Sequence, residues 1–326
     1  MKDVGKIINK NVRIPYLDLL KVIAAFLMVF YHFAYYRLDY GFLEGAKYIP
    51  NFNRILMCFA SCCVPLFFMV NGTLMLGRER TWKSVYLKAG KILLLVIVWS
   101  FADFPSWFFK TLIVLYILYP IFQYCFREKR NFYCGICILI FVFPFLYNFC
   151  IFVIESIGIV SVGPILVKNL QTTGVFTMYG ILYFLLGPIL EEKRLSLIKG
   201  TICMILGWGI VVTECTVYTN LNAIMYDGVN AAFPTLGALL LTVGCYSMVQ
   251  YLQLQKIAKF LEWMGSSSLS IYLMHMIIIK CINFIYNSYH LNTGTALFCS
   301  VMICLICTIL GKGIAKIPKV CWLMKI

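Results

Sequence analysis

Residues 16–32 read YLDLLKVIAAFLMVFYH, and this stretch does most to decide the fold. With its apolar flanks it is long enough to form a helix that crosses a membrane, which takes about 20 mostly apolar residues. It nevertheless contains three ionisable side chains, those of Asp18, Lys21 and His32. Ionisable groups inside a membrane are costly and are therefore candidates for function. The stretch predicts a first transmembrane helix that carries chemistry.

The composition of the whole chain also indicates a membrane protein. Of its 326 residues, 62% are hydrophobic and 13% are charged, and the mean hydropathy is +0.88. A soluble domain has about 25% charged residues, so a soluble protein of this size would lack the polar groups to cover its surface. This excludes a soluble enzyme, a disordered protein and a disulfide-stapled secreted domain. Basic residues that gather in cytoplasmic loops explain the net charge of +15, so we expect no nucleic-acid partner.

Apolar runs between charged residues or Gly and Pro breaks predict an all-α, polytopic integral membrane protein with about ten transmembrane helices. They lie at roughly 15–36, 52–77, 86–103, 107–126, 132–154, 174–190, 197–217, 230–250, 266–288 and 294–315. Asp103 and Pro105 interrupt the third run, which continues to Pro120, so a single kinked helix there would give nine spans. No repeat or long linker divides the chain, and we treat residues 1–326 as one domain.

Lys and Arg residues fall mainly in alternate loops between the expected spans. If the N-terminus is inside, the basic clusters at 78–91, 127–130 and 312–325 all lie on the inner side. Positive charge in short loops favours the cytoplasmic side of a membrane. The pattern predicts that both termini are cytoplasmic and that the number of spans is even. We therefore expect a multi-pass protein of the plasma or inner membrane, with lipid as its surroundings.

The fifteen cysteines do not form a recognisable framework. Most lie within apolar runs, and so do the two C-x-x-C spacings, Cys134 with Cys137 and Cys304 with Cys307. No His and no second cysteine pair stands at zinc-finger spacing from them. We expect these residues to pack as small hydrophobes and predict no metal site.

Lys21 and His32 lie on one face of the expected first helix. At about 100° per residue, the eleven steps between them end about 20° past three full turns, with a separation of about 16 Å along the axis. Other interpretations stay open at this point. Lys21 could extend to the lipid headgroups, Asp18 could simply pair with it at i−3, and His32 could pack at a helix interface.

A series of further stretches follows in a recognisable order. They are YLDLLKVIAAF at 16–26 with His32 after it, VPLFFMVNG at 64–72, KAGK at 88–91, WF at 107–108 leading to LYILYP at 115–120, and SLSIYLMH at 268–275. The series resembles the integral-membrane acyltransferase-3 family, whose motifs are LDxLR with a basic residue eleven positions before His, VPLFFxxSG, R-x-x-R, WFL…LYLxxP and SxxIYLxH. This sequence departs from the family pattern by having Lys at 21, 88 and 91 where Arg is commoner, and Asn71 in place of Ser.

The resemblance implies a membrane O-acetyltransferase-like enzyme. Its donor substrate would be acyl-CoA, usually acetyl-CoA, with no bound cofactor, and its acceptor a hydroxyl of a cell-surface or lipid-linked glycan. His32 would be the general base. Lys21, Lys88 and Lys91 would bind the CoA phosphates as point charges, because Lys lacks the planar fork of Arg.

Four residues are possible supporting members of this site. Asp18 accompanies Lys21, and Asn71 marks either a kink or close helix contact, or else a ligand contact. Trp107 is either an anchor at the membrane interface or part of the site. His275 either has a role in the site or makes an interhelical hydrogen bond. The sequence gives no indication of the oligomeric state.

The sequence leaves open whether His32 acts directly or through a covalent acyl intermediate, and two further questions stay open. One question is which group orients His32. Asp18 cannot, because it is about 21 Å away along the same helix. Asp103, Glu214 and Asp227 are candidates, because they lie near the outer ends of spans. The functional class is the other, because a transporter or exporter of a glycan or lipid-linked sugar would also have many spans and buried charge.

Overall fold

In the computed structural model, every regular element of the described residues is a helix; the described residues are 13–78, 80–100, 106–157, 176–226, 228–231, 233–285, 291–318 and 320–324. The elements of the first half are α1 (Pro15–Ala34), α2 (Phe52–Phe59), η1 (Ala60–Cys62), α3 (Cys63–Leu76), α4 (Trp82–Trp99), α5 (Trp107–Ile117), α6 (Tyr119–Glu128), α7 (Arg130–Ile140), η3 (Phe141–Leu146) and α8 (Tyr147–Ser156). Those of the second half are α10 (Phe176–Glu192), α11 (Leu197–Asn222), α12 (Gly228–Ala231), α13 (Leu236–Val249), η4 (Gln255–Ile257), α14 (Ala258–Gly265), α15 (Ser268–Ile285), α16 (Thr293–Ile314) and η5 (Cys321–Met324).

Six helical segments of the described chain are long and apolar enough to cross a membrane. They are Pro15–Ala34, Phe52–Leu76, Arg130–Ser156, Leu197–Asn222, Ser268–Ile285 and Thr293–Ile314, and the pair α5 and α6 would make a seventh if it is one span. The other expected spans correspond to α4, which carries three lysines, and to the shorter α10 and α13. The all-helical, multi-pass membrane fold is thus confirmed, whereas the count of ten and the cytoplasmic termini stay predictions.

Prolines explain why several expected spans are broken. Pro65 follows the 3₁₀ turn η1 that separates α2 from α3, Pro120 lies next to a bend of 55° between α5 and α6, and Pro144 lies in the π-helical turn η3. Proline removes a backbone donor and clashes with the preceding turn, which bends or breaks a helix. α4 and α5 pack against each other as two separate helices, so the single kinked helix of the nine-span alternative does not form.

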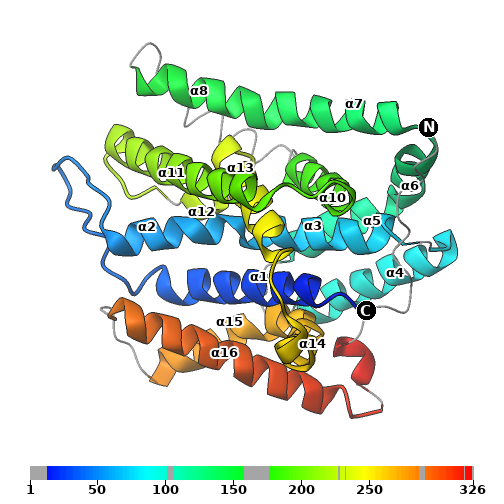
Figure 1. The fold of residues 1–326 in the computed structure, drawn as a ribbon. Helices are drawn as coiled ribbons and strands as arrows, with labels where there is room; N and C mark the ends of the chain where they lie inside the picture. Colours follow the sequence, from blue (N-terminus) through cyan, green and yellow to red (C-terminus); the bar gives the residue numbers. More distant parts are fainter. Residues whose placement is uncertain are drawn as a thin grey trace.

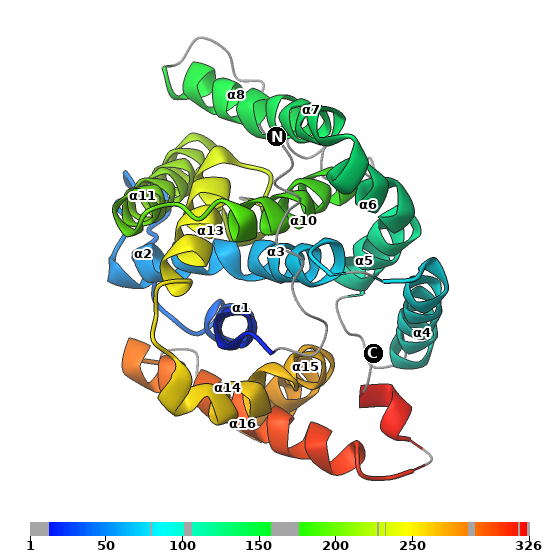
Figure 2. The same cartoon turned by 45° about the vertical axis from the view of Figure 1, so that its right-hand side comes forward.

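Helix α1 lies at the centre of the molecule. It packs against α3 on one side and against α14, α15 and α16 on the other (Figures 1 and 2). Small residues such as Ala24 and Ala25 are fully buried along it, which allows the neighbouring helices to approach closely. The side chains of α1 therefore face protein over most of the helix rather than lipid.

Helices α3 and α10 touch through their glycines. A Cβ atom on Gly72 would collide with the carbonyl oxygen of Phe184, and one on Gly187 would collide with the carbonyl oxygen of Met69. Only glycine allows two helix backbones to lie this close. The close helix contact expected near Asn71 is therefore present, and it holds α3 against α10.

The outer helices expose large apolar side chains. Phe132 and Ile138 of α7, Ile205 of α11 and Phe298 of α16 are each more than half exposed. A soluble protein does not leave so many such groups in water. Lipid is the environment that would cover them, in agreement with the multi-pass fold.

Candidate functional site

Asp18 anchors the N-terminal end of α1 in a network of charges. Its carboxylate accepts hydrogen bonds from Arg13, with Nε to Oδ2 at 2.6 Å, and from Lys21, with Nζ to Oδ1 at 3.4 Å. Arg13 also pairs with Glu262 of α14 at 3.2 Å. Gly265 ends α14 against the Asp18 side chain, where a Cβ atom would have no room. The carboxylate is thus buried, and it holds the Lys21 ammonium group in place.

A cavity of about 350 Å³ lies beside Lys21. Its walls come from α1, α3, α4, α5, α14, α15 and η5, and most of them are apolar or aromatic. The lining residues are Lys21, Phe67, Val70, Asn71, Leu74, Lys88, Ile92, Phe108, Phe109, Leu112, Tyr116, Gly265, Ser266, Ser268, Leu269, Tyr272 and Met324. The cavity thus combines two ammonium groups with an apolar interior, an arrangement suited to a ligand with an anionic head and a less polar arm.

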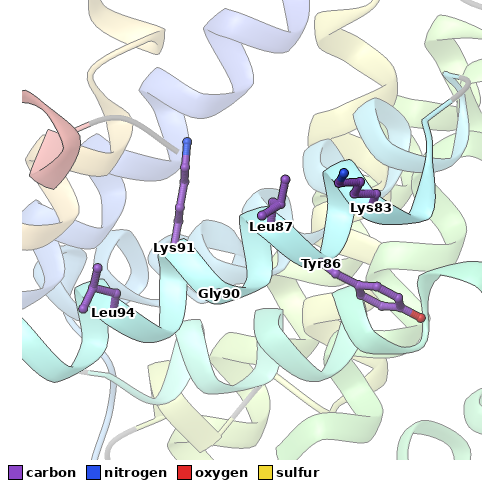
Figure 3. Close-up of a pocket in the computed structure, with 6 residues that line it drawn as sticks. All are labelled: Lys83, Tyr86, Leu87, Gly90, Lys91 and Leu94. Atoms are coloured by element: carbon purple, nitrogen blue, oxygen red, sulfur yellow. The ribbon is translucent and has the colours of Figure 1, made fainter.

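The three predicted phosphate-binding lysines do not all reach this cavity. Lys21 and Lys88 both line it, although they come from different helices. Lys91 instead lies on the exposed side of α4, in an open groove formed by that helix alone (Figure 3). Residues three positions apart differ by only about 60° around a helix, so Lys91 lies at the exposed edge of the face that Lys88 turns toward the cavity.

Asn71 contributes a polar group to the cavity wall. Its Nδ2 donates to the carbonyl oxygen of Phe67 at 2.8 Å, and its Oδ1 accepts from the hydroxyl of Tyr116 at 3.4 Å. Both Asn71 and Tyr116 line the cavity. The neighbouring Gly72 makes the close contact with α10, whereas a ligand contact by Asn71 stays a prediction.

Two histidines lie together farther along α1. The ring centroids of His32 and His275 are 5.2 Å apart, with an angle of 42° between the rings. His275 is fully buried, and its Nδ1 lies 3.1 Å from the carbonyl oxygen of Ile271 and 2.8 Å from that of Tyr272. The sequence predicted His275 as a possible supporting residue, and in the structure it lies directly beside His32.

The acidic candidates for the partner of His32 lie elsewhere or outside the described residues. Glu214 is buried in α11, a helix that packs chiefly on α13 and α2. Asp103 and Asp227 fall outside the described part of the chain. The ring of His32 contacts that of Tyr31 on its own helix and that of His275, from a helix more than 200 residues later in the sequence.

Aromatic rings stand between the cavity and the two histidines. Tyr272 lines the cavity, and its ring centroid is 6.0 Å from that of His275. The rings of Phe108 and Phe109 pack against Tyr272 at 5.3 and 4.9 Å. His32 is not among the described residues that line the cavity. Tyr272 therefore contacts both the cavity that Lys21 and Lys88 line and the imidazole of His275.

Sequence reasoning missed part of this site. It selected Trp107, but the ring of Trp107 packs 5.9 Å from that of Phe233, and Trp107 is not among the described cavity-lining residues. The next residue, Phe108, is the one that lines the cavity. Tyr272 was also missed, although it belongs to the same stretch as His275. One signal was available, because Tyr272 and His275 are three positions apart and share a helix face.

Comparison with known proteins gives one match. A model of the acyltransferase-3 family, described as an acyltransferase domain, matches residues 14–104 and 101–312. The matched segments contain every residue that lines the cavity except Met324, and they also contain both His32 and His275. Comparisons with curated proteins and with solved structures found no match.

Proposed function

The chain belongs to the acyltransferase-3 family, and on that basis we propose that it transfers an acyl group, acetyl first of all, from cytoplasmic acyl-CoA to a hydroxyl of a cell-surface or lipid-linked glycan. The observation that carries the proposal is the cavity, which is lined by Lys21 and Lys88 together with mostly apolar and aromatic side chains, and whose lining residue Tyr272 contacts the imidazole of His275. The protein itself is a multi-pass membrane acyltransferase, and the donor, the acyl group and the acceptor are what the proposal adds.

The charges around the cavity favour an anionic donor. Asp18 offsets part of the positive charge of Arg13 and Lys21, while Lys88 is the second cation that lines the same space. The phosphates of CoA would lie against these ammonium groups, since Lys binds phosphate as a point charge. The hydroxyl-bearing Ser266 and Ser268 lie in the same lining. The less polar pantetheine arm would occupy the apolar part.

The proposed reaction is an acyl transfer with His32 as general base. Neutral His32 takes the proton of the acceptor hydroxyl while the hydroxyl oxygen attacks the thioester carbonyl carbon. The carbon–sulfur bond then breaks, and the CoA sulfur leaves with the proton that His32 gives back. Ester formation and thiol release therefore balance without any further reactant.

The distance along α1 fits the length of the donor. Lys21 and His32 are separated by about 16 Å of helix, which an extended pantetheine arm can span. The rings of Tyr272 and Phe108 lie on this route, so the thioester would displace them when the donor is bound. Donor from one side of the membrane and acceptor from the other would then meet at His32.

The test is acyl transfer by membranes that contain the protein. Membranes with the wild-type protein, His32→Ala or the surface variant Lys259→Ala are incubated with radiolabelled acetyl-CoA, and label is followed into the glycan fractions. We expect labelling by the wild type and by Lys259→Ala, with loss in His32→Ala. Labelling by His32→Ala at the wild-type rate would overturn the role of His32. Movement of a glycan across the membrane without any need for acyl-CoA would instead indicate an exporter.

A further inference from the structure

His275 has one nitrogen that is satisfied and one that is not. The two backbone carbonyl oxygens near Nδ1, those of Ile271 and Tyr272, can only accept hydrogen bonds, so Nδ1 carries a hydrogen. Nε2 is buried and has no hydrogen-bond partner among the described residues. Buried polar atoms are nearly always paired, and an exception calls for an explanation.

The tautomer of His275 follows from these contacts. In a neutral imidazole with hydrogen on Nδ1, Nε2 has a free lone pair and is an acceptor. A hydrogen on Nε2 as well would make the ring a cation in a fully buried position, with no acceptor for that hydrogen among the described residues. His275 is therefore a neutral ring that presents an acceptor.

The ring of His32 lies nearer to that of His275 than the ring of Tyr272 does, with centroid separations of 5.2 and 6.0 Å. With centroids 5.2 Å apart, a small rotation brings facing nitrogen atoms to hydrogen-bond distance. The second ring nitrogen of a catalytic histidine usually makes the bond that decides which tautomer is present. His275 is in the position to make that bond.

We propose that His275 is a positioning residue, which accepts an N–H group of His32 on its Nε2 and so keeps the other nitrogen of His32 free to take the acceptor's proton. The proposal rests on the proposed function, because it assigns a role within the acyl-transfer step. His275 itself neither gains nor loses a proton. When His32 takes the proton of the acceptor hydroxyl, the resulting cation donates to the same Nε2 atom, and the proton later leaves with the CoA sulfur.

Two amide variants separate this role from simple packing. In His275→Asn the side-chain NH₂ group can still donate to the backbone carbonyls, but nothing replaces Nε2. In His275→Gln the longer side chain can place its carbonyl oxygen, an acceptor, near the former Nε2 position. We expect His275→Asn to lower kcat at least about tenfold, within the range by which general-base catalysis contributes, with KM for acetyl-CoA within twofold of wild type. We expect His275→Gln to keep most of the activity.

Several results would overturn the proposal. Full activity of His275→Asn, an equal loss in both variants, or a loss expressed in KM alone would each show that no acceptor is needed at Nε2. Thermal unfolding in detergent is measured for both variants, since a packing role predicts that activity follows stability. A wild-type protein without acyl-CoA-dependent transfer would instead contradict the proposed function, and so the two failures are distinguishable.

A spectroscopic measurement tests the proposal even where a variant fails to fold. The chain has only three histidines, so ¹⁵N-histidine spectra of the wild-type protein in membranes contain few signals, and His32→Gln assigns those of His32. We expect His275 to show one protonated and one unprotonated nitrogen near neutral pH, and His32 to show a single tautomer. A doubly protonated His275, or two exchanging tautomers of His32, would contradict the assignment.

Discussion

The first turns of α1 and its last turns solve the problem of buried polar groups in opposite ways. Near the start, Asp18 accepts hydrogen bonds from both Arg13 and Lys21, so charges of opposite sign offset one another. Near the end, His32 faces the neutral ring of His275, whose acceptor nitrogen is unpaired among the described residues. A fully paired network is suited to binding and anchoring, whereas a neutral pair with an open acceptor is suited to moving a proton. In the proposed reaction, one helix thus carries donor binding at one end and the chemical step at the other.

The His32→Ala variant should show the largest difference between the two ends of α1, by changing kcat and not donor binding. We expect kcat for acyl transfer to fall by about 100-fold or more, because a general base contributes a factor of this order. Binding of acyl-CoA should be nearly unchanged, since the ammonium groups are at the other end of the helix. Transfer assays and direct binding of labelled acyl-CoA to the same preparation measure both quantities. If binding and kcat were lost together, the two ends would not be separable.

Lys21→Ala should show the reverse behaviour. A hydrogen bond to a charged group contributes about 1.5–3 kcal/mol, so KM for acyl-CoA should rise about tenfold or more while kcat changes little. Lys21→Arg keeps the charge and should restore most of the affinity. KM measured over a range of acyl-CoA concentrations decides the matter. A kcat defect at unchanged KM would place Lys21 in the chemical step instead.

Lys88→Ala and Lys91→Ala form a matched pair on α4. Lys88 lines the cavity and Lys91 lies in the outer groove, so we expect KM to rise about three- to tenfold for Lys88→Ala and by less than about twofold for Lys91→Ala, whose charge is exposed and screened. Both lose the same charge from the same helix, so a general effect of charge would act on them equally. Equal changes would mean that the donor does not occupy the cavity.

Asp18→Asn should have the smallest effect on turnover and a clear effect on stability. The amide cannot balance Arg13 and Lys21, and breaking a buried pair from one side is destabilising. We expect the Tm in detergent to fall by about 3 °C or more, while KM for acyl-CoA stays the same or decreases, because a negative charge beside the donor phosphates is removed. A rise in KM would show that Asp18 has to hold Lys21 in one position for binding.

The sequence could predict what depends on one helix at a time. The shared face of Lys21 and His32 follows from helical geometry alone, and α1 bears it out as one continuous helix. The same holds for the all-helical fold, since apolar runs of sufficient length leave few alternatives. The helix breaks near Pro65 and Pro120 also had a visible cause.

What depends on packing between distant segments could not be predicted. Lys88 and Lys91 belong to one motif, and only the orientation of α4 against the bundle decides which of them enters the cavity. His275 meets His32 because α15 packs on α1, although the two residues are far apart in the chain. Spacing within a segment carries no information on such pairs. The choice of Phe108 over Trp107 depends on packing in the same way.

The glycine contact between α3 and α10 has a mechanical consequence. Because Gly72 and Gly187 leave no room for side chains between the two backbones, we expect the wall of the cavity that carries Asn71 to move little. Elsewhere the cavity is lined by side chains from α5, α15 and η5, among them Phe108, Tyr272 and Met324, and the rings of the first two pack against each other. We therefore expect a ligand that enters the cavity to move these side chains rather than the backbone of α3.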